Sequence, residues 1–369
     1  MKTVTVNIPA HNPAAYDIRI GGGLLARLGE MLRAVAPAPT CAMVTDSNVG
    51  PHYLAPATAA LEQAGYRVVT HVIEAGEQHK TLATVSAALD TILGARVERA
   101  TPVVALGGGV VGDLAGYVAA SLLRGVPFVL APTTLLAAVD ASVGGKVGVD
   151  HKAGKNLIGA FHQPRLVVTD IDTFRTLPAR EIRCGLAECI KHAVIRDAGL
   201  FDFIRQNAGV LGTCAKAGWG ETMGDLVARN VAIKAAVVEE DPFEHGVRAL
   251  LNFGHTFGHA IENVMEYAGI QHGEAVALGM VAAGRMAVRL GRFGTEDCGR
   301  MAALIQAVGL PTRLPGLDSD KIFAAMFTDK KVRGGKLRFV LPTRIGQAEV
   351  VEGVAEGAVR EAIGELGNS

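Results

Sequence analysis

Residues 103–113 read VVALGGGVVGD, and this stretch decides the fold class. A short apolar run typical of a buried strand ends in consecutive glycines, and a segment with helical character follows. A strand, a glycine-rich turn and a helix in this order are typical of α/β proteins with a parallel sheet. The turn would expose backbone N–H groups at a helix N-terminus, where a pyrophosphate could bind. It matches neither the G-x-G-x-x-G pattern nor the P-loop, and a purely structural tight turn explains it equally well.

The rest of the chain extends this pattern and then changes it. Apolar strands are predicted at residues 41–45, 67–73, 126–130 and 166–170, and a helix at 82–95. Several of these strands end in Thr or Asp, as expected where a parallel sheet binds a nucleotide. Helical periodicity dominates further on, at residues 179–197, 221–240, 255–268, 273–291 and 296–308, with extended segments at 336–341 and 347–351. We predict an α/β nucleotide-binding domain over 1–178 and a mainly helical domain over 179–369.

Composition excludes several classes of function. The chain has 369 residues, with Lys+Arg and Asp+Glu both at 36, so it lacks the excess positive charge that would attract nucleic acid or acidic lipid. No apolar run reaches the roughly 20 residues that span a bilayer, and the N-terminus lacks the apolar core of a signal peptide. The five cysteines show no CxxC spacing, which favours a reducing compartment. We therefore predict a cytoplasmic protein that binds neither nucleic acid nor membranes.

Polar residues in the first half suggest anion and nucleotide binding. Residues 132–156 place Lys146 and Lys155 among glycines and small apolar residues, where lysines serve better as anion ligands than as solvent-facing side chains. Asp46 ends a strand and could hold a ribose hydroxyl, although such an Asp is more often a helix cap. The polar loop 74–81 precedes a helix, and a solvated helix cap would explain it structurally.

The helical half combines histidines and carboxylates in three segments, at residues 185–192, 248–262 and 271–276. Histidine and carboxylate side chains on helices are typical ligands of a catalytic zinc ion. His255 and His259 are four residues apart, as are Glu188 and His192, so either pair could face one metal ion. Chemistry alone does not choose between these pairs.

Seven segments occur together in one order: GEQHKT (76–81), GGGVVGDLAGYVAA (107–120), LLRGVPFVLAPTTLLAAVDASVGGKVGV (122–149), GKNLIGAFHQP (154–164), GLAECIKH (185–192), RALLNFGHTFGHAIE (248–262) and HGEAVALGM (272–280). In this order they resemble the 3-dehydroquinate synthase family along most of the chain. The resemblance implies a Rossmann-like NAD-binding domain, a helical metal-binding domain holding zinc or cobalt, an active site between them and a homodimer.

The resemblance also implies roles for individual residues. The metal ligands would be Glu188, His255 and His272. NAD contacts are implied for Asp46, Glu77, Lys80, Gly108, Gly109, Val110, Val111, Gly112, Asp113, Thr133, Thr134, Asp140, Lys146, Lys155, Thr173, Phe174 and Thr176. Substrate contacts are implied for Arg124 (toward the neighbouring subunit), Asp140, Lys146, Asn156, Lys191, Lys234, Arg248, Asn252, His259 and Lys330. Of these, Lys146, Asn156, Lys191, Arg248, Asn252 and His259 would take part in catalysis by holding charge and orienting the substrate.

The implied reaction converts 3-deoxy-arabino-heptulosonate 7-phosphate into 3-dehydroquinate and phosphate, a step of the shikimate pathway of aromatic amino-acid biosynthesis. NAD+ would take a hydride from C5, phosphate would leave by β-elimination, the hydride would return, and an aldol step would close the ring. Another sugar phosphate cyclase, making a deoxy-inosose or a valiolone, would share the fold and the cofactors. A metal-dependent alcohol dehydrogenase would accumulate NADH without releasing phosphate, and the lysines of 146–156 argue against it. A non-enzymatic binding protein would leave the metal and anion residues unexplained.

Overall fold

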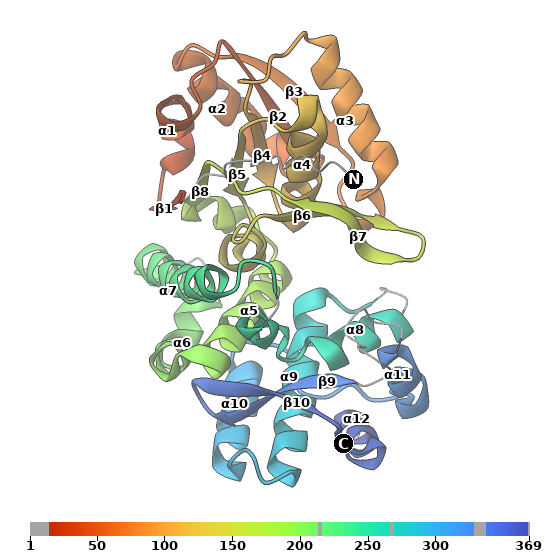
Figure 1. The fold of residues 1–369 in the computed structure, drawn as a ribbon. Coiled ribbons are helices and arrows are strands. Elements are labelled where there is room, and N and C mark those ends of the chain that lie inside the picture. Colours follow the sequence, from red (N-terminus) through yellow and green to blue (C-terminus); the bar gives the residue numbers. More distant parts are fainter. Residues whose placement is uncertain (1–14, 213–215, 245, 266–268, 328–336, 368–369) are drawn as a thin grey trace, which may run out of the picture. The chain divides into compact units, whose positions relative to one another are not determined.

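A computed structural model describes residues 15–212, 216–244, 246–265, 269–327 and 337–367 (Figure 1). The chain forms two compact units. Gly23–Pro132 and Gly144–Thr169 belong to the first unit, whereas Thr133–Val143 and the chain from Asp170 onward belong to the second. The units thus differ from the predicted ranges, because Thr133–Val143 groups with the helical half. The domain boundary near Pro178 stays a prediction.

The first unit is built on a six-stranded sheet with the order β1-β8-β5-β4-β2-β3. Its strands are β1 (Asp17–Gly21), β2 (Thr40–Asp46), β3 (Arg67–Ile73), β4 (Val103–Gly107), β5 (Phe128–Pro132) and β8 (Leu166–Asp170). The pairs β2–β3, β2–β4, β4–β5 and β5–β8 are all parallel. The strand order reverses between β2 and β4, because β3 lies on one side of β2 and the later strands lie on the other. In open α/β sheets, ligands bind at the carboxyl ends of the strands at such a switch point.

Both faces of this sheet are buried, which explains the continuous apolar runs of its strands. Along β4, Val103 and Ala105 enter one hydrophobic cluster, and Val104 and Leu106 enter the other. Two helices, α3 (Leu82–Gly94) and α4 (Gly109–Ser121), supply apolar side chains to the first cluster. The other pair, α1 (Leu28–Val35) and α2 (Gly50–Gln63), supplies the second. The sheet is therefore doubly wound, which confirms the predicted α/β class.

A hairpin joins this unit outside the main sheet. Strands β6 (Lys146–His151) and β7 (Gly154–Phe161) pair antiparallel, with an irregularity between Val149 and His151. The hairpin packs on α4 at Gly116, where a Cβ atom would lie 2.2 Å from Cγ1 of Val147. Glycine is needed there because no side chain fits. The sequence had suggested only a polar, anion-binding segment, so the hairpin was missed.

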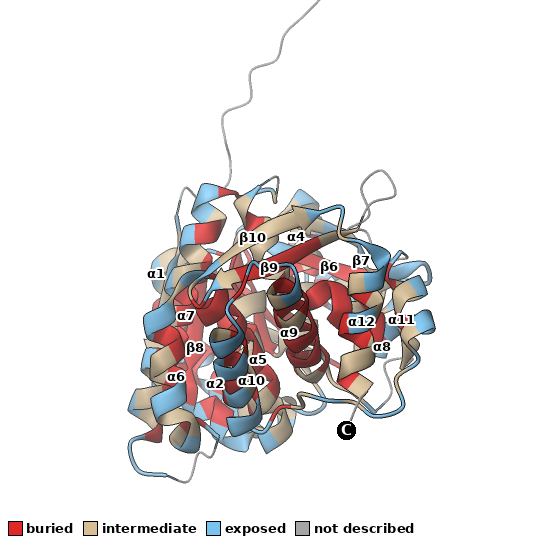
Figure 2. Cartoon of the chain, turned by 90° about the horizontal axis from the view of Figure 1, so that it is seen from below, coloured by how far each residue is buried: buried red, intermediate tan, exposed pale blue. Residues whose placement is uncertain are grey.

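The second unit is mainly helical. It contains α5 (Ala179–Arg196), α6 (Ala198–Leu211), α7 (Trp219–Glu240), α8 (His255–Val264), α9 (His272–Arg289), α10 (Thr295–Ala307), α11 (Ser319–Met326) and α12 (Glu356–Gly367), with the antiparallel pair β9 (Arg338–Arg344) and β10 (Gln347–Glu352). Helix α9 is buried along nearly its whole length, in contact with α8, α5, α12, α10 and β9 (Figure 2). None of the described helices has the length and apolar character needed to cross a bilayer.

Every strand predicted in the α/β half is present, as are the helices predicted with strong periodicity. Helices α1, α2, α6, α11 and α12 were missed. Helices α1 and α11 have only eight residues each, and α2 contains Pro56, a residue type that usually breaks a helix. The segment Ala137–Ala141 is a π-helix, which periodicity cannot reveal.

Candidate active site

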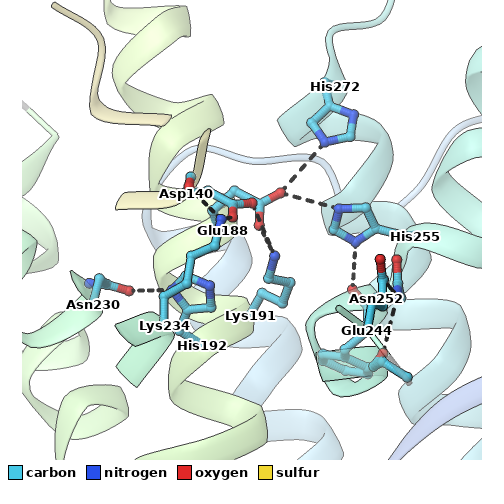
Figure 3. A network of polar contacts seen from close by, with 12 residues as sticks. Asp140, Glu188, Lys191, His192, Asn230, Lys234, Glu244, Asn252, His255 and His272 are labelled. Carbon is cyan, nitrogen blue, oxygen red and sulfur yellow. Dashed lines mark hydrogen bonds and ion pairs between the residues drawn. The ribbon is translucent and has the colours of Figure 1, made fainter. Parts of the chain in front are cut away.

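Three potential metal ligands converge in the second unit. Nε2 of His255 and Nε2 of His272 each lie 3.6 Å from Oε1 of Glu188 (Figure 3). The ligand atoms of these residues lie within 4.8 Å of one another. Two histidines and one carboxylate form the ligand set of catalytic zinc sites, in which a fourth position stays open for water or substrate.

Three helices position these ligands. Glu188 lies in the middle of α5 and is fully buried, whereas His255 and His272 are the first residues of α8 and α9. Gly254, with φ of 79°, turns the chain into α8, and a Cβ atom there would lie 2.8 Å from the carbonyl oxygen of Val276. A glycine at this position therefore lets α8 approach α9 and bring His255 to the cluster.

Hydrogen bonds orient both imidazoles for metal binding. Nδ1 of His255 lies 3.1 Å from the carbonyl oxygen of Phe253, and Nδ1 of His272 lies 3.2 Å from Oε2 of Glu262. Each Nδ1 can donate to its oxygen acceptor, which leaves Nε2, the ring nitrogen that faces Glu188, as the atom available to a metal ion. Partners of this kind fix the tautomer of metal-bound histidines.

The carboxylate itself supports the same conclusion. Neither oxygen of Glu188 accepts a hydrogen bond of good geometry from the described residues, although Lys191 forms an ion pair with it. A fully buried carboxylate requires compensation by cations or hydrogen bonds. Burial by itself would raise the pKa of Glu188, but the charges of Lys191 and His255 hold that pKa below its ordinary value. The carboxylate is therefore ionised, as a metal ligand must be, and the residues present fit a zinc or cobalt ion.

The structure also groups His259, Glu262 and His272 as a second possible ligand set. This group shares His272 with the first. Neither group contains both His255 and His259, and neither contains His192. Nδ1 of His192 lies 3.1 Å from Oδ1 of Asn230 instead. Spacing of four residues on one helix therefore does not identify the ligands here.

A charged cluster lies beside Glu188. Asp140, on the π-helical segment, forms ion pairs with Lys234 and, at 3.4 Å, with Lys191 (Figure 3). Both lysines are almost fully buried. Lys191 also bridges to Glu188, so one ammonium group connects the candidate metal site to Asp140. This network brings together residues separated by up to 94 positions in the chain.

Electrostatics in this cluster favour an anionic ligand. Burial would raise the pKa of Asp140, but Lys191 and Lys234 hold it well below its usual range. Burial is the largest influence on Lys234 and lowers its pKa despite the contact with Asp140. A lowered pKa means that nearby negative charge does not fully offset the cost of burying the ammonium group of this lysine. An additional anion would stabilise its charged form.

Arg248 adds a third buried cation. It lies in a 3-10 turn, Val247–Asn252, and its Nη1 donates to the carbonyl oxygen of Pro242 at 2.6 Å. After burial, which is the largest influence, the charges of Lys191 and Arg248 also act to lower the pKa of Lys234. In the same turn, Asn252 donates through Nδ2 to Glu244 at 3.3 Å. The second unit thus buries Lys191, Lys234 and Arg248, and the first two share a contact with Asp140; their substrate contacts stay a prediction.

In the first unit, predicted cofactor residues follow the carboxyl ends of the strands. Asp46 ends β2, and its Oδ1 accepts the backbone N–H groups of Asn48 and Val49 at 2.9 and 2.8 Å. One carboxylate oxygen thus caps the turn before α2, whereas α2 itself has no side-chain cap. Residues 109–113 are the first turn of α4 rather than a free loop. The glycine-rich turn is therefore confined to Gly108, between the end of β4 and the N-terminus of α4.

The remaining predicted contacts of this unit vary in exposure. Glu77 lies 3.8 Å from Nζ of Lys155. Lys80 is buried and contacts Asp113, whereas Lys146 is exposed at the start of β6. Arg124 is exposed, and Lys330 lies outside the described residues.

Threonines after β5 and β8 belong to the second unit. Oγ1 of Thr133 is buried without a hydrogen-bond partner among the described residues, so a ligand contact would satisfy it. Oγ1 of Thr134 accepts the N–H of Ala137 at 3.1 Å. The hydroxyls of Thr173 and Thr176 donate to carbonyl oxygens of their own turn, and Phe174 is fully buried. Of these residues, Thr133 shows the clearest signal of a missing partner.

Glu262 and Asn230 received no role from the sequence, and His192 only that of a possible metal ligand paired with Glu188. All three are buried. Glu262 follows His255 by seven residues on α8, so helical periodicity places both on one face and could have revealed it. The contact between His192 and Asn230 joins α5 to α7 and left no signal in the spacing.

Comparison with solved structures defines the class first. A 2-epi-5-epi-valiolone synthase from Streptomyces hygroscopicus subsp. jinggangensis 5008, solved with NAD+ and Zn2+, matches with a TM-score of 0.88 and 30% identity over 98% of this chain and 99% of its own. A 2-deoxy-scyllo-inosose synthase, solved with carbaglucose-6-phosphate, NAD+ and Co2+, matches with a TM-score of 0.87 and 27% identity over 95% and 96%. A glycerol dehydrogenase from Schizosaccharomyces pombe, at 18% identity and a TM-score of 0.68, shares the fold. The fold is therefore shared with cyclases that were solved with NAD+ and a divalent metal ion.

Sequence comparison then defines the family. The family models described as 3-dehydroquinate synthase N-terminal and C-terminal match residues 70–184 and 185–332. A 3-dehydroquinate synthase from Microcystis aeruginosa is 45% identical over 98% of this chain and 97% of its own, and one from Synechococcus sp. (strain ATCC 27144) is 46% identical over 99% and 100%. The chain belongs to the 3-dehydroquinate synthase family.

Proposed function

We infer that this chain is a 3-dehydroquinate synthase that uses NAD and a divalent metal ion, zinc or cobalt. The substrate is 3-deoxy-arabino-heptulosonate 7-phosphate, and the products are 3-dehydroquinate and phosphate. The observation that carries this function is the cluster of Glu188, His255 and His272 beside buried Lys191 and Lys234. Relatives at about 45% identity over nearly the whole chain bear the same name.

The chain's own residues would hold a substrate with two anionic ends. Lys191, Lys234 and Arg248 supply three buried positive charges against the carboxylates of Asp140 and Glu188, an arrangement suited to a phosphate or carboxylate. When bound, NAD supplies a reversible hydride acceptor, and the metal ion a Lewis acid for the hydroxyl at the oxidised carbon. Burial strengthens every charge–dipole interaction in such a site, so these cations would also stabilise charge that develops as phosphate leaves.

Roles for the other predicted residues remain part of this proposal. Asn252 and His259 would orient the substrate near the metal ligands, and His259 lies close to them, with ring centroids 5.4 Å from His255 and 5.9 Å from His272. Lys146 and Asn156 would add contacts from the β6–β7 hairpin. The NAD contacts predicted after β2, β4, β5 and β8 would bind the nucleotide.

We also propose a homodimer in the cytoplasm. The exposed side chains of Leu157 and Phe161 on β7 support an interface, because both are large, apolar and more than 40% exposed. Light scattering coupled to size exclusion would measure the mass directly. A monomer at micromolar concentration would contradict the dimer.

One assay tests the function. The purified protein is incubated with 3-deoxy-arabino-heptulosonate 7-phosphate, NAD+ and zinc, while inorganic phosphate and NADH absorbance are followed together. Phosphate release that a chelator abolishes, without accumulation of NADH, is the expected result, and product analysis should identify 3-dehydroquinate. Net NADH without phosphate would indicate a dehydrogenase. Activity only on another sugar phosphate would indicate a different cyclase.

A further inference from the structure

Lys80 has an unusual environment in the first unit. It follows the short 3-10 turn Glu77–His79, and only 3% of its surface is exposed. Its ammonium group donates to Oδ2 of Asp113 at 2.6 Å and to Oδ1 of Asn156 at 2.5 Å. A buried lysine is held charged only by close acceptors. Burial by itself would lower the pKa of Lys80. The negative charge of Asp113, the largest opposing influence, helps to raise the pKa of Lys80 above its ordinary value.

Three hydrogen bonds close a ring that includes this lysine. The carbonyl oxygen of Lys80 accepts the N–H of Asp150 at 2.8 Å, and Oδ1 of Asp150 accepts the N–H of Asn156 at 2.8 Å. Oδ1 of Asn156 accepts from Lys80, which completes the ring. Asp150 lies at the irregularity in the β6–β7 pairing, between Val149 and His151. An irregularity of this kind re-aims a side chain, and here the carboxylate of Asp150 faces the backbone N–H of Asn156.

The ring holds Asn156 in a conformation that most side chains avoid. Its φ is 53°, in the left-handed region, which asparagine tolerates better than most residues. Strained backbone persists where the surroundings determine it, and here both the backbone N–H and the side chain of Asn156 are held.

We propose that Lys80 is a positioning residue that sets the orientation of the Asn156 amide and thereby ties the predicted nucleotide-binding residue Asp113 to the substrate-binding hairpin. An ammonium group can only donate, so Asn156 must turn its oxygen toward Lys80. Its amide N–H₂ then points the other way and can donate to an acceptor on the ligand, such as a phosphate, carboxylate or hydroxyl oxygen. The substrate part of this inference rests on the proposed function, whereas the ring itself does not.

A double-mutant cycle tests the coupling. Lys80→Met, Asn156→Gly and the double variant are compared at saturating NAD+ by phosphate release from 3-deoxy-arabino-heptulosonate 7-phosphate. Glycine suits the left-handed backbone, so Asn156→Gly removes the amide without strain. Lys80→Met is expected to lower kcat/KM by about 10- to 100-fold, the size expected for a hydrogen bond to a charged group. In the Asn156→Gly background the same change should cost less than about twofold, because the two positions act as one unit.

Additive losses in the double variant would overturn the proposal. So would a weaker NAD+ affinity by calorimetry with kcat/KM unchanged at saturating NAD+, because Lys80 would then be only a cofactor contact. Asn156→Asp gives an independent test of orientation, since it keeps the contact with Lys80 but replaces the donor end by an acceptor. Wild-type activity of Asn156→Asp would show that the orientation proposed for the Asn156 amide is wrong.

A measurement without turnover separates this proposal from the proposed function. Amide hydrogen exchange of residues 146–161 in the ligand-free protein should become faster at Asn156 in Lys80→Met and stay unchanged in Lys152→Met, an exposed lysine of the same hairpin. Unchanged exchange in Lys80→Met would refute the ring as a positioning device even if the enzyme is active. Faster exchange in a protein that releases no phosphate would leave the ring intact and reject the assigned reaction.

Discussion

The imidazole of His272 is held between two carboxylates. Its Nδ1 lies 3.2 Å from Glu262 and its Nε2 lies 3.6 Å from Glu188. Glu262 is buried, and burial of a charged group is tolerated only when it is paired. The two carboxylates therefore have different tasks: Glu188 would share the metal ion with His272, and Glu262 would hold the ring and make it a better electron donor.

Replacing Glu262 should weaken metal binding. Glu262→Gln keeps an acceptor for Nδ1 but removes the charge, so we expect zinc affinity to fall by about 10-fold, and Glu262→Ala by up to about 100-fold. Competition with a chromophoric chelator measures this affinity. Glu296→Gln, an exposed glutamate on α10, is the matched control. Wild-type affinity in Glu262→Ala would mean that His272 needs no such support.

The two possible ligand sets make different predictions for the histidines. His255→Ala and His272→Ala should empty the metal site, because each removes one of only three protein ligands. His259→Ala should retain the metal but lower turnover. Metal content by mass spectrometry after gel filtration, together with kcat, distinguishes these results. Loss of metal in His259→Ala with retention in His255→Ala would favour the set of His259, Glu262 and His272.

Packing of α8 on α9 should control the metal site from a distance. A Cβ atom on Gly279 would lie 1.9 Å from the carbonyl oxygen of Gly254, the residue before His255. Gly279→Ala must therefore push α8 away, and we expect a stability loss of about 1–3 kcal/mol, the usual cost of overpacking, with weaker metal binding. Thermal unfolding and zinc titration measure both effects.

Gly299→Ala provides the contrast, because a Cβ atom on Gly299 in α10 would meet nothing within 4 Å. The gain in helix propensity should make that variant neutral or more stable by up to about 1 kcal/mol. Equal stability losses in the two variants would show that close packing is not the cause.

Stability should depend on His192 at mildly acidic pH. Burial, followed by the charge of Lys191, lowers the pKa of His192 from 6.5 to about 4. The unfolded chain therefore takes up a proton at higher pH than the folded chain. The contribution of His192 is fully present above about pH 6.5 and is lost as the pH falls toward 4.

The variant His192→Asn isolates this effect, because its amide can still donate to Asn230 but does not titrate. Between pH 6.5 and 4, the free energy of unfolding of the metal-free protein should fall less steeply in this variant than in the wild type. Urea titrations with a chelator present measure the slope. Identical slopes would mean that the imidazole is not buried in its neutral form.

Several features could be read from the sequence because they depend on local patterns. The inner strands β2, β4, β5 and β8 are largely apolar runs because both of their faces are covered, and the long helices of the second unit show their buried stripes. The presence of a histidine and carboxylate site followed from residue types, and its ligand set from the resemblance. The β6–β7 hairpin did not follow, because its glycines and lysines hide the alternation of a strand.

Residue chemistry and apolar periodicity were enough to predict the class of fold, and the order of the motifs predicted the family and, through the resemblance, NAD and metal binding. The tertiary structure alone decided which groups meet. Spacing of four residues favoured His255 with His259 and Glu188 with His192, whereas packing of α5, α8 and α9 brings Glu188 to His255 and His272 instead. The ring of Lys80, Asp150 and Asn156 likewise spans residues up to 76 positions apart. Such contacts depend on how helices and strands pack against one another. A glycine that permits close packing does not reveal in the sequence which element packs against it.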